Sequence, residues 1–345
     1  MRKLAIVILN WNGCDMMRQY LPSVLKNSEG DVIVADNASS DESLQMLGRE
    51  FPDVRTIVLD RNYGFAEGYN RALARLTEYE YFLLLNSDVE IRQRGWDKVL
   101  TDYMDEHPDC AACQPKLLDL KRPTHFEYAG AAGGFIDRYG YPFCRGRILS
   151  TIEEDKGQYD DVCDIMWATG AALLCRATDW RNCGGLDSRF FAHMEEIDLC
   201  WRLRNMGRRI VCVPQSTAYH LGGATLNQGN PRKTFLNFRN NRYMLHKNLP
   251  SNILHRVLFV RTLLDCVAAL QFLLKGDVGN AKAVIKAWKS PMPDEGTGLA
   301  EKNSYSSFVN NLPQDVSLSK KNSTLMSYSI LWQYYARGKR AFCDL

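Results

Sequence analysis

Two common phosphate-binding signatures are missing from this chain of 345 residues. No G-x-G-x-x-G follows the first predicted strand and no G-x-x-x-x-G-K-[ST] occurs anywhere, so neither a dinucleotide fingerprint nor a P-loop is indicated. The chain also lacks an excess of one charge, because 43 Lys and Arg against 40 Asp and Glu leave a net charge of +3. Nucleic acid is therefore not an expected partner, since it requires a clustered basic face.

A disulfide framework is missing as well. The eleven cysteines are odd in number and irregular in spacing. Cys110-Ala-Ala-Cys113 is the single C-x-x-C pair, and a four-thiolate zinc site needs a second one. The chain opens with a predicted strand and not with a secretory apolar segment. We therefore expect ordinary, reduced, buried thiols in a cytoplasmic protein.

Short apolar segments alternate with amphipathic ones in the first part of the chain. These patterns predict strands at 4–9, 32–35, 54–59 and 81–85, and helices at 14–28, 41–51 and 65–79, the second capped by Ser39 or Ser40. Repeated strand, helix and strand units predict an α/β fold with a doubly wound, mostly parallel sheet. Ligands bind such sheets outside the carboxyl ends of the strands, so the residues after each strand are the candidates for a site.

Polar residues follow each of the four predicted strands. They are Asn10 and Asn12, Asp36 and Asn37, the segment from Arg61 to Gly64, and Asn86-Ser87-Asp88. Asn, Asp, Ser and Gly are also ordinary turn residues, so any one of these segments has a purely structural explanation. Because all four segments would meet at one crevice, we favour a nucleotide-binding site.

A nucleotide bound without a glycine-rich cradle needs another counter-charge for its phosphates. Asp88 ends an apolar strand and offers the hard oxygen ligand that suits Mg²⁺ or Mn²⁺. His220 is a candidate for a further ligand, although a histidine on its own is more often structural. The sequence therefore predicts a divalent metal that bridges the diphosphate oxygens.

Three carboxylates lie within four residues of each other, at Glu195, Glu196 and Asp198, next to Phe190 and Phe191. A solvated helix start is one explanation, because acids interact favourably with the positive end of the helix dipole. Asp198 and Arg202 are also spaced as a structural i, i+4 pair. We favour a functional cluster, because an acid cluster together with a strand-end Asp suits metal-assisted transfer chemistry.

These segments together resemble family 2 glycosyltransferases of the GT-A fold, within the rhamnosyltransferase-like group. The resemblance covers about residues 4 to 225, and its segments keep the family's order along the chain. They are Val7 to Asn12, Val34 to Asp41, Asn62 to Asn70, Leu84 to Asp88, Ala168 to Ala172, Gly184 to Asp187, Glu195 to Arg202, and Tyr219-His220. A collinear set of this kind is far more specific than any single motif.

The resemblance implies an enzyme that transfers a sugar, with inversion, from a nucleotide diphosphate donor to an acceptor hydroxyl. The expected donor is linked to dTDP or UDP, with rhamnose as the first choice of sugar. The expected acceptor is a glycan or a polyprenyl-linked saccharide in cell-surface polysaccharide synthesis. A catalytically degenerate protein that binds sugar nucleotides or glycans is the alternative. A nucleotidyltransferase is a weaker one, because it would normally carry a glycine-rich basic loop after the first strand.

The matched positions also imply contacts with the donor and the metal. Asp36 corresponds to an Asp that recognises the base, and Asn62 to a position that lines the nucleotide pocket. Asn86-Ser87-Asp88 corresponds to the metal-binding D-x-D motif, with Asn86 in place of the first Asp, and His220 corresponds to a metal ligand. The complete set expected around the donor is Asn10, Asn12, Asp36, Asn62, Gly64, Asn70, Asn86, Ser87 and Asp88, with Asp88 and His220 on Mg²⁺ or Mn²⁺.

The acid cluster is expected to supply the general base of the transfer. An inverting reaction needs one group that takes the proton from the acceptor hydroxyl as the anomeric carbon is attacked. Glu196 corresponds to the second acid of the family's E-D pair, so we choose it as the base. Glu195 and Asp198 are expected as orienting or competing groups.

The character of the sequence changes after about residue 225. We expect a catalytic domain at 1–225, a helical extension at 226–290 and a polar, aromatic tail of unknown role at 291–345. The extension contains predicted helices at 234–248 and 253–274. Arg261 and Asp265 make the second a poor spanning segment by length and composition, so packing against the catalytic domain is preferred over attachment to the membrane interface.

A basic bias in the extension keeps interfacial attachment open, because Lys and Arg favour anionic headgroups. The residues concerned are Arg256, Arg261, Lys275, Lys282, Lys286 and Lys289. The protein is therefore expected in the cytoplasm, with a peripheral contact at the inner face of the plasma membrane and a homodimer both left open.

Overall fold

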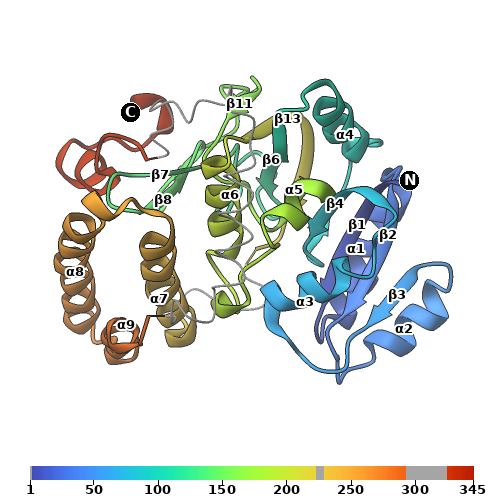
Figure 1. The fold of residues 1–345 in the computed structure, drawn as a ribbon, viewed down its shortest axis with the longest axis horizontal. Coiled ribbons are helices and arrows are strands. Elements are labelled where there is room, and N and C mark those ends of the chain that lie inside the picture. Colours follow the sequence, from blue (N-terminus) through green and yellow to red (C-terminus); the bar gives the residue numbers. More distant parts are fainter. Residues whose placement is uncertain (1, 223–228, 293–324) are drawn as a thin grey trace.

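The computed structural model describes residues 2–222, 229–292 and 325–345. Its main feature is a nine-stranded sheet in the order β11-β13-β6-β12-β4-β1-β2-β3, with β5 paired to β13. The strands are β1 (Arg2–Asn10), β2 (Asp31–Asp36), β3 (Arg55–Val58), β4 (Tyr79–Leu85), β5 (Val89–Glu90), β6 (Cys110–Asp119), β11 (Cys163–Asp164), β12 (Ala172–Arg176) and β13 (Arg209–His220). Helices cover both faces of this sheet (Figure 1).

Alternate residues of the central strand β1 point to opposite faces and both sets are buried. Leu4, Ile6 and Ile8 pack towards α1 (Cys14–Asn27), α2 (Ser43–Glu50) and α4 (Trp96–Glu106). Ala5 and Val7 pack towards α3 (Gly64–Leu73), α5 (Ala177–Asn182) and α6 (Glu195–Asn205). Burial on both faces explains why this strand is a continuous apolar segment, as in other sheets covered on both sides.

The sheet is parallel in its N-terminal half and mixed beyond it. β4, β1, β2 and β3 are parallel neighbours, and so are β6 and β13. β12 lies between β4 and β6 and runs antiparallel to both. The predicted α/β architecture with a doubly wound, mostly parallel sheet is therefore confirmed.

Two predicted helix boundaries were wrong. The second helix begins at Ser43 and not at Asp41, because Ser39 turns towards Asn10 and Asp41 accepts a hydrogen bond from the Ser43 N–H at 3.0 Å. The third helix ends at Leu73 and not near Tyr79. Tyr79 instead begins β4, where it is buried and pairs with Arg2, and aromatic residues suit such strand positions.

A small antiparallel sheet lies beside the large one, formed by β7 (Gly134–Ile136), β8 (Pro142–Cys144), β9 (Arg147–Ile148) and β10 (Thr151–Ile152). The last described segment, 325–345, docks on this sheet. Its Ile330 and Tyr334 pack with Phe143 and Ile148, and the Tyr334 hydroxyl lies 2.8 Å from Thr151 Oγ1. Part of the tail of unknown role thus completes the small sheet, while residues 293–324 lie outside the described part of the chain.

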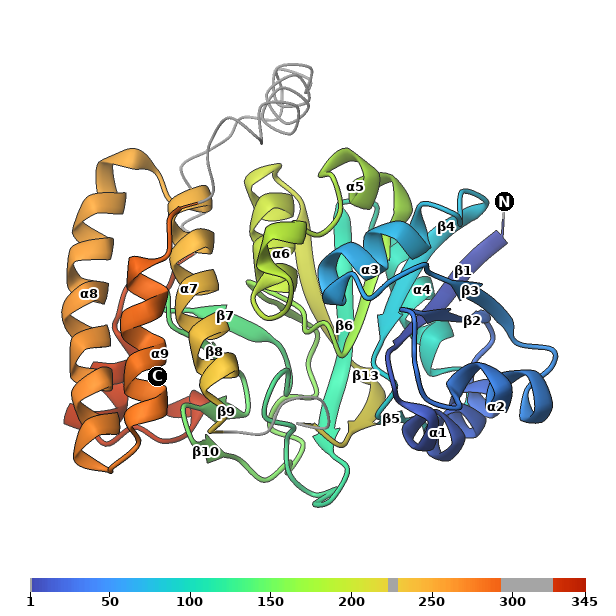
Figure 2. The ribbon, with the colours of Figure 1, turned by 90° about the horizontal axis from the view of Figure 1, so that it is seen from below.

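Between residues 229 and 292 the chain forms three helices, α7 (Pro231–Asn248), α8 (Ser251–Leu274) and α9 (Val278–Lys289). α7 lies beside α6, α9 packs against both α7 and α8, and α8 forms an outer edge of the molecule in both ribbon views (Figures 1 and 2). The expected boundary near residue 225 falls among residues that are not described, so the division into domains stays a prediction.

All eleven cysteines are free thiols, and seven of them are buried. Cys110 and Cys113 both lie in the core strand β6 and are fully buried. Within the described ranges, the structure brings no three His, Cys, Asp or Glu side chains together as a ready-made metal site. The cysteines therefore pack as small apolar side chains.

Candidate active site

The end of β4 and the end of β13 meet at one edge of the large sheet. β5 pairs with the last residues of β13, Tyr219 and His220, and so carries Asp88 to the histidine. His220 Nε2 lies 3.1 Å from Asp88 Oδ1 and 3.3 Å from Asn86 Nδ2. Three of the predicted metal and donor residues therefore lie side by side, although 132 residues separate Asp88 from His220 in the sequence.

Glu127 is part of this group, and the sequence analysis missed it. Its Oε1 lies 3.2 Å from His220 Nδ1, so the imidazole is held between two carboxylates. Burial by itself would lower the pKa of His220, but Glu127 and Asp88 outweigh burial and raise this pKa to about 10. An acidic partner on Nδ1 is also the usual means of orienting a metal-binding histidine so that Nε2 faces the metal. No sequence pattern marks Glu127, which precedes a stretch of small residues.

Asp36 ends β2 and is held by the loop that follows this strand. Its side chain is fully buried, and its two carboxylate oxygens accept hydrogen bonds from Asn10 Nδ2 at 3.0 Å and from the Ser39 N–H at 2.8 Å. Asn12 acts on the same turn, because its Oδ1 accepts from the Ser40 N–H at 2.7 Å. In this structure the three residues shape the loop after β2.

The loop before α3 is shaped in the same way. Asn62 Oδ1 accepts hydrogen bonds from the Gly64 N–H at 2.8 Å and from Asn37 Nδ2 at 3.2 Å. Gly64 has a φ of 75°, and a side chain there would strike the ring of Phe191. The Phe65 N–H donates to the Phe191 carbonyl at 2.9 Å. The predicted nucleotide loop and the segment that leads to the acid cluster therefore touch.

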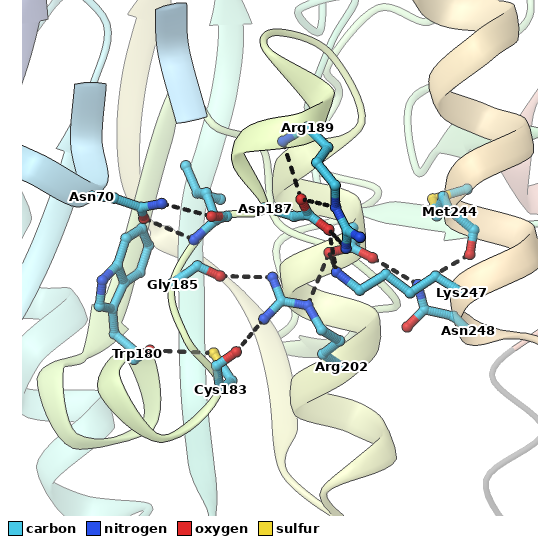
Figure 3. Close-up of polar contacts among 12 residues, drawn as sticks. Asn70, Trp180, Cys183, Gly185, Asp187, Arg189, Arg202, Met244, Lys247 and Asn248 are labelled. Atoms are coloured by element: carbon cyan, nitrogen blue, oxygen red, sulfur yellow. Dashed lines mark hydrogen bonds and ion pairs between the residues drawn. The ribbon is translucent and has the colours of Figure 1, made fainter. Parts of the chain in front are cut away.

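Asn70 and Ser87, two further residues expected around the donor, contact different parts of the chain. Both ends of the Asn70 amide bind the backbone of Leu186, with Nδ2 donating to its carbonyl at 2.6 Å and Oδ1 accepting from its N–H at 3.0 Å. Figure 3 shows Asn70 beside the Gly185 segment. Its amide therefore ties α3 to the chain before α6. The Ser87 hydroxyl lies by Gly13 and Asn10, at the end of β1.

The acid cluster begins helix α6 after a strained segment. Phe191, His193 and Met194 all have positive φ angles, of 65°, 71° and 73°. Such angles are costly for residues with side chains and persist where the surroundings enforce them. Here Asn240 of α7 enforces them, because its Nδ2 donates to the carbonyls of Phe190, Ala192 and His193 at 2.8–2.9 Å.

Glu195 and Glu196 are neighbouring carboxylates in the first turn of α6. Within the described residues the Oε2 atom of each is buried and has no hydrogen-bond partner. Burial raises the pKa of Glu196 to about 7, and burial together with Glu196 raises the pKa of Glu195 well above its usual range. A carboxyl group whose pKa lies near neutrality is suited to exchange a proton with substrate.

Asp198 is occupied by structural partners. Its Oδ1 accepts from Asn248 Nδ2 at 2.8 Å, and its Oδ2 accepts from Arg202 Nε at 2.8 Å and from Lys247 Nζ at 3.0 Å. Burial alone would raise the pKa of Asp198, but Lys247 and Arg202 hold it below its usual value. The contacts therefore favour a structural Asp198 over a competing base.

These contacts belong to a larger network that joins α6 to α7 (Figure 3). Lys247 also lies 2.7 Å from Asp187, which in turn binds Arg189. Arg202 donates to the carbonyls of Cys183 and Gly185 at 2.5 and 2.6 Å. We call Asp187, Arg189, Asp198, Arg202, Lys247 and Asn248 the α6–α7 network. It fixes the start of α6 and the loop before it.

A short segment before β12 connects the acid cluster with the strand-end motif. The Asn86 N–H donates to the Ala171 carbonyl at 3.0 Å. On the preceding residue, the Gly170 N–H interacts with the Glu196 carboxylate, and a Cβ at Gly170 would lie 3.8 Å from Glu196 Cβ. Glu196 thus contacts Gly170 and Asn86 contacts Ala171, so two consecutive residues connect the acid with the strand-end motif.

The fold and this arrangement define a class of proteins before any family is considered. The chain superposes on GalNAc-T7, solved with UDP, GalNAc and Mn²⁺, with a TM-score of 0.55 at 14% identity over 71% of this chain and 48% of that one. It superposes on the mannosyltransferase PcManGT from Pyrobaculum calidifontis, solved with GDP-Man and Mn²⁺, with a TM-score of 0.50 at 14% identity over 90% of this chain and 84% of that one. The fold is that of GT-A glycosyltransferases.

Sequence comparison makes the assignment more specific. The profile described as Glycosyl transferase family 2 matches residues 5–130. The chain is 26% identical over 236 residues to N-acetylglucosaminyl-diphospho-decaprenol L-rhamnosyltransferase of Mycobacterium tuberculosis H37Rv, covering 63% of this chain and 75% of the relative. It is 26% identical over 214 residues to rhamnosyltransferase WbbL of Escherichia coli K12, covering 58% and 78%. The chain is a glycosyltransferase that resembles family 2 over residues 5–130 and is similar to rhamnosyltransferases over about three fifths of its length.

The α6–α7 network leads to a prediction about stability. Replacing Lys247 with Met leaves the buried Asp198 with less counter-charge. We therefore expect the free energy of unfolding to fall by about 2–4 kcal/mol at neutral pH. The matched control is Lys98→Met, which breaks the exposed pair with Asp102 and should cost about 0–1 kcal/mol. Urea unfolding measures both variants.

The effect of Lys247→Met should depend on pH in one direction. Asp187 and Asp198 have lowered pKa values in the folded protein, so their ion pairs stabilise it at neutral pH and are lost as pH falls through those values. The difference between wild type and Lys247→Met should therefore shrink in acid. Equal destabilisation by the two lysine variants at neutral pH would contradict the role given to the network.

Proposed function

We propose that this glycosyltransferase moves a sugar, with inversion, from a nucleotide diphosphate sugar to an acceptor hydroxyl. The observation that carries the proposal is that two groups of side chains contact the consecutive residues Gly170 and Ala171. The first group is Asn86 with its neighbours Asp88 and His220. The second is the buried carboxylate of Glu196. The first group can hold the diphosphate end of a donor through a cation. The second can take a proton from the acceptor.

The residues around Asp88 fit a divalent cation. Asp88 offers a buried carboxylate, His220 offers Nε2 once its proton leaves, and turning the Asn86 amide offers an oxygen. When bound, Mg²⁺ or Mn²⁺ would neutralise the charge that develops on the leaving diphosphate. One carboxylate alone binds a divalent cation weakly, because such cations prefer several oxygen ligands. We therefore infer that phosphate oxygens of the donor would supply the remaining ligands.

Glu196 is the group that we propose as general base. Its carboxylate is buried, is raised to a pKa of about 7 and has one oxygen without a partner among the described residues. Glu195 beside it favours the state in which only one of the two is ionised, because two neighbouring buried charges repel each other. Asp198 is left to position the helix.

The names of the relatives support the choice of substrates. A rhamnosyltransferase that acts on a decaprenol-linked diphospho-sugar and rhamnosyltransferase WbbL are both similar to this chain along more than half of its length. We therefore propose a dTDP- or UDP-linked donor, with rhamnose first, and a saccharide or lipid-linked saccharide acceptor in cell-surface polysaccharide synthesis.

Removal of the proposed base gives the most direct prediction. Glu196→Gln should lower transfer by about 10²–10⁴-fold, because the amide cannot take the acceptor proton, while donor affinity stays unchanged. In the wild type, activity should rise with pH up to about 7 as the carboxyl loses its proton. Steady-state kinetics and donor titration measure both effects, with the exposed Glu78→Gln as control. Full activity in Glu196→Gln would move the base to Glu195.

The metal site gives a separate prediction. Asp88→Ala should weaken Mn²⁺-dependent binding of the nucleotide diphosphate at least about tenfold, because it removes the charged ligand. Glu127→Gln should also weaken it by about tenfold or more, because His220 loses the carboxylate that orients it. Calorimetry with nucleotide and Mn²⁺ measures both. Asp102→Asn is a control, because its carboxylate is 53% exposed and pairs with Lys98 on α4. Unchanged affinity in Asp88→Ala would contradict the site.

The nucleotide itself can be identified by thermal stabilisation. A ligand that binds only the folded state raises the free energy of unfolding by RT ln(1 + [L]/Kd), and the melting temperature rises with it. We expect a shift with dTDP or UDP and their sugars that depends on Mn²⁺, and little shift with Mn²⁺ alone. No shift with any nucleotide diphosphate would contradict the donor site and favour a degenerate one.

A further inference from the structure

Helix α8 is long and apolar enough to cross a membrane by length and composition, yet only 22% of its most apolar window is buried. A core helix of a soluble protein with this composition would be mostly buried. α8 instead occupies an outer edge of the molecule, with one side against α7 and α9 (Figures 1 and 2). Its other side therefore needs a partner that tolerates apolar side chains.

The two charges that argued against a lipid contact lie on the inner side of α8. Arg261 is 4% exposed and Asp265 is 2% exposed. They lie 3.3 Å apart, Trp288 Nε1 donates to Asp265 at 2.9 Å, and the Arg261 guanidinium lies 3.8 Å from the ring centre of Tyr141. Both charges are therefore satisfied within the protein, and neither lies on the outer surface.

The outer side of α8 is a continuous apolar face. It is formed by Phe259, Leu263, Val267, Leu270 and Leu274, which are 54–79% exposed. Their spacing of three or four residues places them in one stripe along the helix. Val278 and Ile285 of α9 are also about half exposed. We call the five residues of α8 the α8 face.

Basic residues lie around this face. Arg256 precedes it on α8 and Lys275 follows it, while Lys282, Lys286 and Lys289 are exposed on α9. Besides the buried pair, α8 has no charged residue between Arg256 and Lys275. An apolar stripe with cations at its borders matches a membrane interface, where acyl chains meet anionic headgroups.

We propose that the α8 face docks this enzyme on the surface of an anionic lipid bilayer, with the helix lying in the interface. The opposite side of α8 is packed on protein and carries a buried ion pair, so the helix would lie on the membrane and not span it. The proposal goes beyond the sugar-transfer reaction and does not depend on it.

A second copy of the chain fits the same face less well. In an antiparallel pair of α8 helices, Arg256 of one copy would come beside Lys275 of the other. In a parallel pair, each cation would come beside its own counterpart. Like charges set against each other disfavour both arrangements, whereas anionic lipid attracts the same residues.

Vesicle sedimentation of the full-length protein tests the proposal. We expect the wild type to bind vesicles that contain phosphatidylglycerol, more weakly as salt is added, and to bind phosphatidylcholine vesicles poorly. Leu263→Gln with Leu270→Gln should lower the partition coefficient about tenfold or more, because the face loses apolar area. Lys275→Gln with Lys282→Gln should lower binding to the anionic vesicles alone.

The matched control is Leu25→Gln with Leu44→Gln, two leucines of α1 and α2 that are each 37% exposed, away from α8. This control should bind vesicles as the wild type does, and equal melting temperatures establish that all variants fold. Vesicle binding by Leu263→Gln/Leu270→Gln at the wild-type level would overturn the proposal. So would a wild type that ignores vesicles but forms a dimer in light scattering that this variant abolishes.

Discussion

The geometry of the site depends on the ion pairs and hydrogen bonds of one buried carboxylate, that of Asp198. It is fully desolvated, and it is stabilised only because α6, through Arg202, and α7, through Lys247 and Asn248, supply its partners. If α7 moved away from α6, Asp198 would lose Lys247 and Asn248 and its buried charge would be poorly paired, which costs free energy. This charge therefore fixes the relative position of the two helices. Asn240 on the same helix α7 then holds the strained segment before the acid cluster. The extension after the catalytic sheet is therefore part of the site's geometry.

Three nearby carboxylates in the same helix have contrasting electrostatic surroundings. Asp198 has cations on both sides and a lowered pKa, whereas Glu195 and Glu196 are buried without cations and have raised values. Within three residues the helix thus carries one acid with a lowered pKa and two acids with raised pKa values. Ion pairs stabilise the charge of Asp198, whereas Glu195 and Glu196 have no cation to stabilise theirs. Groups held in unfavourable states of this kind are common at functional sites.

Local patterns predicted much of this fold. Strand runs that are apolar throughout, such as Leu4 to Leu9, identified the central strands, and polar residues that follow these strands contact one another. Prediction failed where the deciding contact was distant. The end of α3 was missed because Tyr79 pairs with Arg2, and Glu127 was missed because its partner His220 is far along the chain. The contacts of Asp36 with Asn10 and Ser39 likewise join segments that no local pattern connects.

The reversed direction of β12 has a consequence for how such an enzyme can change. β12 starts at the edge of the sheet where its antiparallel neighbours β4 and β6 end, so the chain that enters β12 lies next to the strand-end motif. Residues 168–171 therefore reach both the strand-end motif and the acid helix without a long connecting loop. A substitution in these four residues would therefore disturb the strand-end motif and the start of α6 at once. A change confined to one of the two is easier in segments that touch only that one.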